Sequence, residues 1–143
     1  MLKAVILFLA LFPLSQCDSQ SEMQSDTVIT YTEETRGSQY SIRFSGRTLQ
    51  VESEGLNPSS TVRRLTRARA SELHALASKL DVSALDGLPT DTAASAADRA
   101  AIAHLHVQTA DGSHRTQAFD AGNPPAAISD FVNLLLEFAE KED

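Results

Sequence analysis

The segment SQYSIRFSG, residues 38–46, constrains the fold more than any other, because it alternates apolar and polar residues. Tyr40, Ile42 and Phe44 are separated by serine and arginine. An alternation of period two is typical of a β-strand in a sheet with one solvated face. The flanking segments TVITYTE (27–33) and RTLQVES (47–53) carry the same pattern more weakly. Together the three segments predict an antiparallel meander.

The hydrophobic period changes after EGLNPSS (54–60), which predicts a loop. A helix capped by Thr66 is predicted next, because apolar residues recur there at intervals of three and four. These residues are Ala70, Leu73, Leu76, Ala77 and Leu80. A second helix is predicted near the C-terminus, with Asn123 as its cap and Pro124 in its first position. Its expected buried face comprises Ile128, Phe131, Val132, Leu135, Phe138 and Ala139.

The segment IAHLHVQTADGSHRTQAFD, residues 102–120, predicts a hairpin that turns at Asp111–Gly112. Two registers are open at this point. A two-residue loop sets Leu105 opposite Ala118, and a three-residue loop sets it opposite Phe119. The connector 83–101 predicts either a disordered segment or a short helix, and it is a candidate contact segment for a partner.

The order of these elements predicts an α+β domain. We expect an antiparallel sheet of about four to five strands with two helices packed on one face, which leaves the other face solvated. Residues 27–143 form the single predicted domain, and the polar segment 18–26 is a predicted flexible tether in front of it.

An apolar run from Ala4 to Phe12 follows Lys3 at the N-terminus. It has about half the ~20 residues that a bilayer-spanning helix needs, so it predicts a secretory signal peptide. The alternative is a buried N-terminal core helix, but the run has no polar face.

The signal peptide ends at the sequence LSQC, residues 14–17, which contains the only cysteine. This sequence resembles the lipobox of bacterial lipoproteins, in which an aliphatic residue and two small residues precede a cysteine. Leu14, Ser15 and Cys17 match, whereas Gln16 stands where the family has a small residue. The resemblance implies that 1–17 is a lipoprotein-type signal segment, that cleavage falls before Cys17, and that its thiol receives a diacylglycerol. The alternative is cleavage after Cys17, which would leave a soluble periplasmic or secreted domain.

The charge and the motifs exclude several functional classes. Lys and Arg number 12 against 19 Asp and Glu, and the resulting net charge of −7 disfavours nucleic acid as a partner. The sequence contains no glycine-rich phosphate loop, no paired cysteine ligands and no nucleophile elbow. We therefore expect neither catalysis nor a cofactor.

Two residue sets remain as candidate sites. His104 and His106 stand two apart on a predicted strand, which places them on one face about 7 Å apart, a spacing that zinc sites use for two ligands. The alternative is a pair of histidines on a solvated sheet face. The segment RRLTRAR supplies the second set, Arg63, Arg64, Arg67 and Arg69. These arginines are expected either to pair with acidic residues of the chain or to bind an anionic partner.

The order of elements carries one further resemblance. The strand segments, the helix LTRARASELHALASKL, the hairpin HLHVQTADGSHRTQAFD and the helix GNPPAAISDFVNLLLEFA look like the pattern of the emfourin inhibitors of thermolysin-type metalloproteases. The resemblance covers residues 27–138 and implies protease inhibition.

The expected function is therefore that of a non-catalytic binding protein anchored by lipid in the cell envelope. Its partners would be the membrane and a secreted or envelope protein such as a metalloprotease. The alternative is a periplasmic protein that binds a metal through His104 and His106, or an anion through the cluster from Arg63 to Arg69.

Overall fold

The computed structural model describes residues 26–96 and 101–141, which form an α+β domain with a seven-stranded antiparallel sheet. The strands are β1 (Val28–Thr35), β2 (Ser38–Ser45), β3 (Thr48–Glu54), β4 (Ser59–Arg64), β5 (Ile102–Thr109), β6 (Gly112–Arg115) and β7 (Phe119–Asp120). Their order is β4-β3-β2-β1-β5-β6, and β7 also pairs with β5. The helices are α1 (Arg67–Ala77), the 3-10 helix η1 (Val82–Gly87), α2 (Ala93–Ala96) and α3 (Ala126–Glu140).

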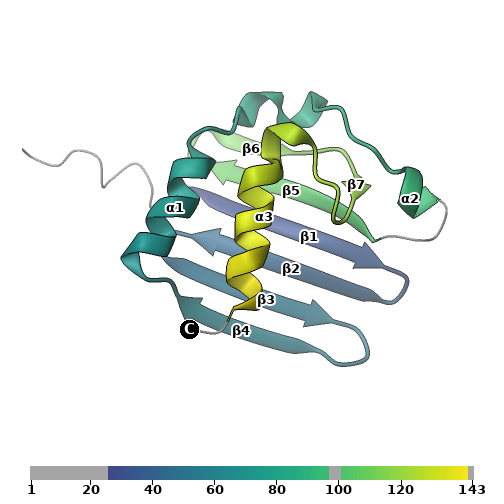
Figure 1. Cartoon of the computed structure of the whole chain (residues 1–143), viewed down its shortest axis with the longest axis horizontal. Helices are drawn as coiled ribbons and strands as arrows, with labels where there is room; N and C mark the ends of the chain where they lie inside the picture. Colours follow the sequence, from purple (N-terminus) through teal and green to yellow (C-terminus); the bar gives the residue numbers. More distant parts are fainter. Residues whose placement is uncertain (1–25, 97–100, 142–143) are drawn as a thin grey trace, which may run out of the picture.

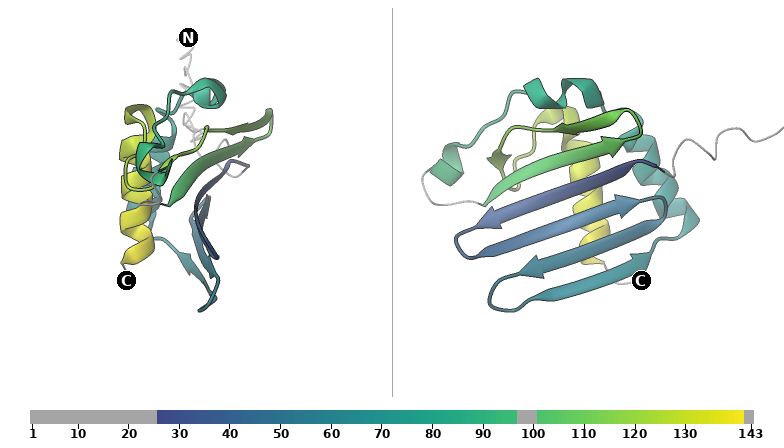
Figure 2. Two further views of the ribbon diagram at one scale, coloured as in Figure 1. Left: turned by 90° about the vertical axis from the view of Figure 1, so that its right-hand side faces the viewer. Right: turned by 180° about the vertical axis from the view of Figure 1, so that it is seen from behind.

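The domain has two layers (Figure 1). Helices α1 and α3 cross one face of the sheet, and the opposite face is free of helices when the molecule is seen from behind (Figure 2). None of the helices in the described ranges has the length and apolar character needed to cross a membrane. The α+β class and the packing of two main helices on one face are as predicted from the sequence.

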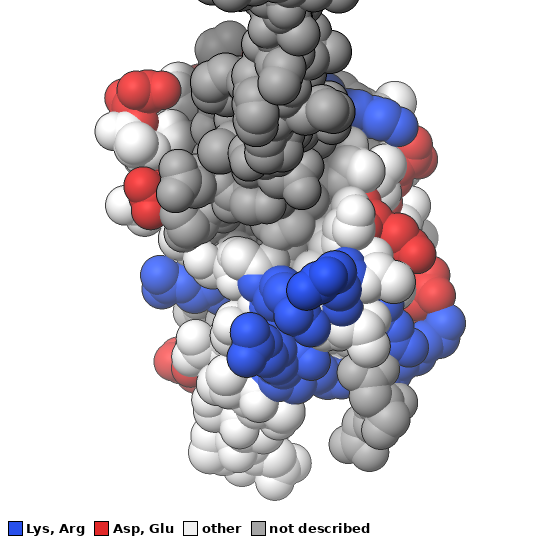
Figure 3. Space-filling view, turned by 90° about the vertical axis from the view of Figure 1, so that its left-hand side faces the viewer, with Lys and Arg blue, Asp and Glu red and all other residues white. Residues whose placement is uncertain are grey.

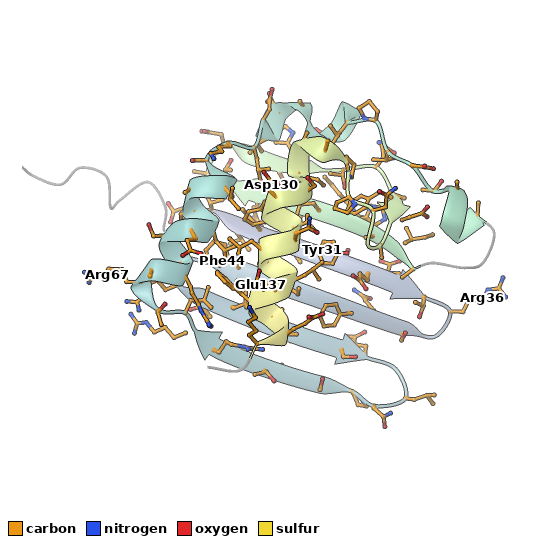
Figure 4. All side chains as sticks on the ribbon, viewed as in Figure 1. Tyr31, Arg36, Phe44, Arg67, Asp130 and Glu137 are labelled. Atoms are coloured by element: carbon orange, nitrogen blue, oxygen red, sulfur yellow. The ribbon has the colours of Figure 1, made fainter. Side chains whose placement is uncertain are left out.

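The core lies between the helices and the inner face of the sheet. Tyr31, Ile42 and Phe44 come from the central strands and are buried. Tyr31 and Phe44 lie beneath α3 and α1 (Figure 4). The Tyr31 hydroxyl donates a hydrogen bond of 2.7 Å to Glu33 Oε1. Burial raises the pKa of Tyr31, so the phenol keeps the proton that it donates. All six residues of the predicted buried face of the last helix are buried: Ile128, Phe131, Val132, Leu135, Phe138 and Ala139.

The prediction of four to five strands was too low. The predicted loop 54–60 runs into β4, which begins at Ser59 and pairs along its whole length with β3. The segment SSTVRR lacks alternating apolar residues because β4 is an edge strand and nearly all of it is exposed. Its strand conformation follows from pairing with β3 and not from its own sequence.

Both predicted hairpin registers were wrong. Thr109 pairs with Gly112, so the turn consists of Ala110 and Asp111, and Leu105 lies opposite Thr116. The Thr116 amide donates to Leu105 O at 2.9 Å, and the Leu105 amide donates to Thr116 Oγ1 at 3.0 Å. This side-chain bond ends the first ladder, and Phe119 then pairs with Ala103 in a separate short strand.

The helix starts were predicted with mixed success. Thr66 caps α1 as expected, because its side chain accepts a hydrogen bond from the Arg69 amide at 3.3 Å. The prediction that Asn123 caps α3 was wrong, since Pro125 holds the cap position and the helix begins at Ala126. A proline disfavours helical geometry in the residue before it, so Pro125 prevents Pro124 from starting the helix.

Candidate functional site

The four arginines of the RRLTRAR segment have different environments, and Arg63 is structural. Its Nη1 donates to Lys141 O at 2.5 Å and its Nη2 donates to Ala139 O at 2.6 Å. Backbone carbonyls at the end of a helix lack helical partners and form the negative end of its dipole. Arg63 therefore ties edge strand β4 to the C-terminal end of α3.

Arg69 is also engaged inside the domain. Its guanidinium carbon lies 5.3 Å from the centroid of the Phe138 ring, a distance at which a cation is attracted to the ring face. The side chain is half-buried between α1 and α3. Like Arg63, it holds secondary-structure elements together.

Arg64 and Arg67 differ from these two because both side chains are exposed. Within the described part of the chain, neither makes an ion pair or a side-chain hydrogen bond. Arg67 opens α1, whose first turn contains no acidic residue, and there the helix dipole disfavours a cation. Figure 4 shows its side chain pointing outward from the start of the helix. The expected pairing with acidic residues of the chain is therefore not found for these two arginines.

A further arginine stands next to this pair. Arg64 lies opposite Thr48, the first residue of β3. The residue before Thr48 in the sequence is Arg47. The guanidinium of Arg47 donates to Leu65 O through Nε at 3.2 Å and Nη2 at 2.9 Å. Lysine and arginine side chains gather on this side of the molecule (Figure 3). We call Arg47, Arg63, Arg64, Arg67 and Arg69 the arginine surface. It presents the exposed guanidinium groups of Arg64 and Arg67, which suit bidentate binding of carboxylate or phosphate.

The second predicted pair, His104 and His106, does share the open face of β5, and both side chains are half-buried. His104 Nδ1 lies 3.3 Å from Thr116 O, and His106 Nε2 lies 2.5 Å from Ser113 Oγ. Among the described residues there is no group of three or more histidine, cysteine or acidic side chains that could hold a metal. The pair is thus brought together as expected, and each ring bonds to the segment that returns from the hairpin turn.

The remaining histidines belong to other contacts. His74 Nε2 lies 2.7 Å from Gly46 O, and its ring packs against Phe44 with centroids 4.9 Å apart. His114 Nδ1 lies 2.7 Å from Asp86 Oδ2 on η1. Neither of them extends the pair on β5.

Asp86 was not predicted from the sequence as a site residue. Besides His114, its carboxylate accepts a hydrogen bond of 3.0 Å from the Arg115 amide, and its carbonyl accepts one of 3.2 Å from Gln117 Nε2. These bonds fasten η1, within the connector predicted to be disordered or helical, to edge strand β6. The sequence around Asp86 does not indicate these contacts, because the partners of Asp86 lie about thirty residues later, in the hairpin.

The hollow between α1 and α3 is small. It is lined by Leu76, Leu80 and Phe131 among others and has a volume of about 60 Å³. Sites for small molecules usually have about 300 Å³ or more. This hollow is therefore too small to hold a typical metabolite.

No protein-family model matches the chain, and no curated protein is significantly similar to it. The resemblance to emfourin inhibitors therefore still depends on the order of elements alone. Cys17, the predicted lipidation site, lies outside the described residues.

Asp86 gives a pH-dependent prediction. The Arg115 amide and the His114 ring lower the pKa of this carboxyl. The stability that its carboxylate contributes is fully present above the ordinary pKa of about 4 and is lost as the pH falls through the lowered pKa. We expect the protection factor of the Arg115 amide, which is the exchange rate of an unprotected amide at the same pH divided by that of Arg115, to fall over that acidic range, and less so in Asp86→Asn. Asp111→Asn, a change at the hairpin turn, is the control. Equal pH profiles of exchange at the Arg115 amide in the wild type and in Asp86→Asn would disprove that the Asp86 carboxylate holds η1 to β6.

Proposed function

We propose that this chain is a non-catalytic binding protein of the bacterial cell envelope, anchored by lipid on Cys17 and facing the periplasm. The apolar run 4–12 and the lipobox-like LSQC support the anchor. A diacylglyceryl group carries two acyl chains, which is the number that stable membrane anchoring requires. The polar segment 18–26 would hold the folded domain away from the headgroups. A soluble periplasmic or secreted protein is the alternative.

The observation that carries the binding role is the pair Arg64 and Arg67, which are exposed and have no acidic partner among the described residues of a chain with net charge −7. Nineteen acidic residues are available in the sequence, yet these two cations face solvent. Arg63 and Arg69 fix the backbone on either side of them, so the exposed groups are presented from rigid elements. Such an arrangement favours an acidic protein surface as the partner.

A secreted or envelope metalloprotease fits this partner class, and the resemblance to emfourin inhibitors points in the same direction. Inhibition requires only a stable complex, so it needs no catalytic residues of the chain's own. We therefore expect one chain to inhibit one enzyme molecule without being consumed.

The test is a titration of a thermolysin-type metalloprotease with the full chain. We expect stoichiometric inhibition, and an inhibition constant raised by about a hundredfold when Arg64→Glu and Arg67→Glu are combined, since each reversal places an acid against an acidic partner. Arg36→Glu makes a single such charge reversal at the opposite end of the strands (Figure 4) and should leave inhibition unchanged. Absence of inhibition would reject the inhibitor role, and undiminished inhibition by the double variant would reject the arginine surface.

The same exposed guanidinium groups support a second candidate, the binding of a small anion. Inorganic phosphate should then raise the melting temperature of the wild type and not that of the double variant. A matching test with zinc and His104→Ala/His106→Ala examines the metal alternative. Stabilisation by phosphate without protease inhibition would favour the small-anion role.

A further inference from the structure

Strand β4 forms an open edge of the sheet. It stands last in the strand order, and all but one of its residues are exposed (Figure 2). It carries no proline and no lysine, and its side chains include Val62, which is 64% exposed. Edge strands of this kind present unpaired backbone groups, which are templates for pairing with another strand.

The ladder between β3 and β4 shows which backbone groups are unpaired. The Leu65 amide donates to Arg47 O at 2.8 Å, so these two residues form a hydrogen-bonded pair. Such pairs alternate along an antiparallel ladder, so Arg63, Thr61 and Ser59 also bond toward β3. The amides and carbonyls of Ser60, Val62 and Arg64 consequently point away from the sheet.

We propose that β4 pairs with β4 of a second copy of the chain, antiparallel and about a twofold axis through Val62, so that two sheets join into one. In this register Val62 faces its own copy, and Ser60 faces Arg64 of the second copy. All three residues with outward backbone groups then exchange hydrogen bonds. An axis at Thr61 would set Arg64 opposite Pro58, which has no amide hydrogen. An axis at Arg63 would set Arg64 opposite Val62, so the two copies of Val62 would not face each other.

The side chains on the open face complement themselves in this register. The two copies of Val62 become cross-strand neighbours, which covers an exposed apolar group. Ser60 lies opposite Glu52 of β3, whose Oε1 accepts a hydrogen bond of 3.4 Å from the Ser60 hydroxyl. Arg64 of the second copy would therefore lie across the small Ser60 from Glu52, about two strand spacings or 9.5 Å away, within reach of two long side chains.

This pairing gives an ionic partner to groups that have none among the described residues. Arg64 makes no ion pair in the described residues, and Glu52 makes only hydrogen bonds there, to Gln50 and Ser60. The twofold axis creates two such arginine–glutamate pairs, one on each side of the Val62 contact. The dimer does not require the proposed binding function, but it would engage Arg64, which that function assigns to the protein partner; the occupant of the β4 edge is a second copy of the chain.

A cysteine at position 62 tests the axis directly. Hydrogen-bonded residues across an antiparallel ladder have Cα atoms about 5.5 Å apart, which lies within the range of a disulfide. We expect the full-length Val62→Cys chain, extracted from membranes in detergent, to form a covalent dimer in a glutathione buffer. The matched control is Leu56→Cys, which is 98% exposed but lies off the axis. The unsubstituted chain reports any cross-linking through Cys17. Cross-linking at 62 no faster than at 56 overturns the proposal.

Sedimentation equilibrium of the full-length chain in detergent tests the contacts. Val62→Pro removes an outward amide and leaves the bonds to β3 intact, so we expect the dimer dissociation constant to rise at least tenfold. Arg64→Glu and Glu52→Arg should each weaken the dimer by roughly tenfold, and the double variant should recover it because the charges are exchanged. A wild type that is monomeric at all concentrations, a dimer that survives Val62→Pro, or a double variant no tighter than the single ones contradicts the proposal.

Discussion

Replacing Phe131 by alanine is expected to lower the free energy of unfolding by about 3–5 kcal/mol. The side chain is 1% exposed and belongs to the single core formed by α1, α3 and the inner face of the sheet. Removing the ring forfeits its burial and leaves a cavity that the neighbouring strands and helices cannot fill without moving. Urea unfolding followed by circular dichroism measures the loss.

The control for Phe131→Ala is Leu56→Ala. Leu56 is 98% exposed at the turn between β3 and β4, so its removal should change stability by no more than about 0.5 kcal/mol. A loss below about 1 kcal/mol for Phe131→Ala would mean that α3 is not packed on the sheet as described.

Replacing Arg63 by alanine has the second largest expected effect. The change removes two charge-assisted hydrogen bonds to carbonyls at the end of α3, and we expect it to lower the free energy of unfolding by about 1–3 kcal/mol. Arg64→Ala, the adjacent substitution on the same strand, should stay within about 0.5 kcal/mol, because its side chain is exposed and makes no ion pair or side-chain hydrogen bond with the described residues.

The two arginine substitutions are compared by thermal and urea unfolding of monomeric protein at low concentration. Arg63→Lys should recover only part of the loss, since an ammonium group cannot donate to both carbonyls with the forked geometry of a guanidinium. Equal destabilisation by Arg63→Ala and Arg64→Ala would contradict the division of the cluster into structural and exposed arginines.

Periodicity determined how much of the fold was predictable. The buried face of α3 was predicted residue by residue, because a helix packed on a sheet must carry apolar residues at intervals of three and four. Strand β4 was missed because its sequence has one large apolar residue, Val62, and its conformation depends on pairing with β3. The start of α3 was misplaced because the effect of Pro125 on Pro124 outweighed the capping tendency of Asn123.

The arginine cluster was predictable from the sequence, but the different environments of its four arginines were not. Arg63 and Arg64 are neighbours in sequence, yet alternation along β4 sends them to opposite faces, and only Arg63 meets the end of α3. The common face of His104 and His106 followed from their spacing. The contact of Asp86 with His114 was not predictable, because it joins segments whose proximity depends on the whole fold.

We propose that this domain is held at the envelope surface by lipid on Cys17. The intact mass of the chain extracted from membranes, beside that of Cys17→Ala, distinguishes a lipid-anchored chain from an unmodified one. We expect a mass that fits residues 17–143 plus a diacylglyceryl group, and its loss in the variant. An unmodified chain that begins at Asp18 would contradict the anchor and would place the arginine surface on a soluble periplasmic or secreted protein.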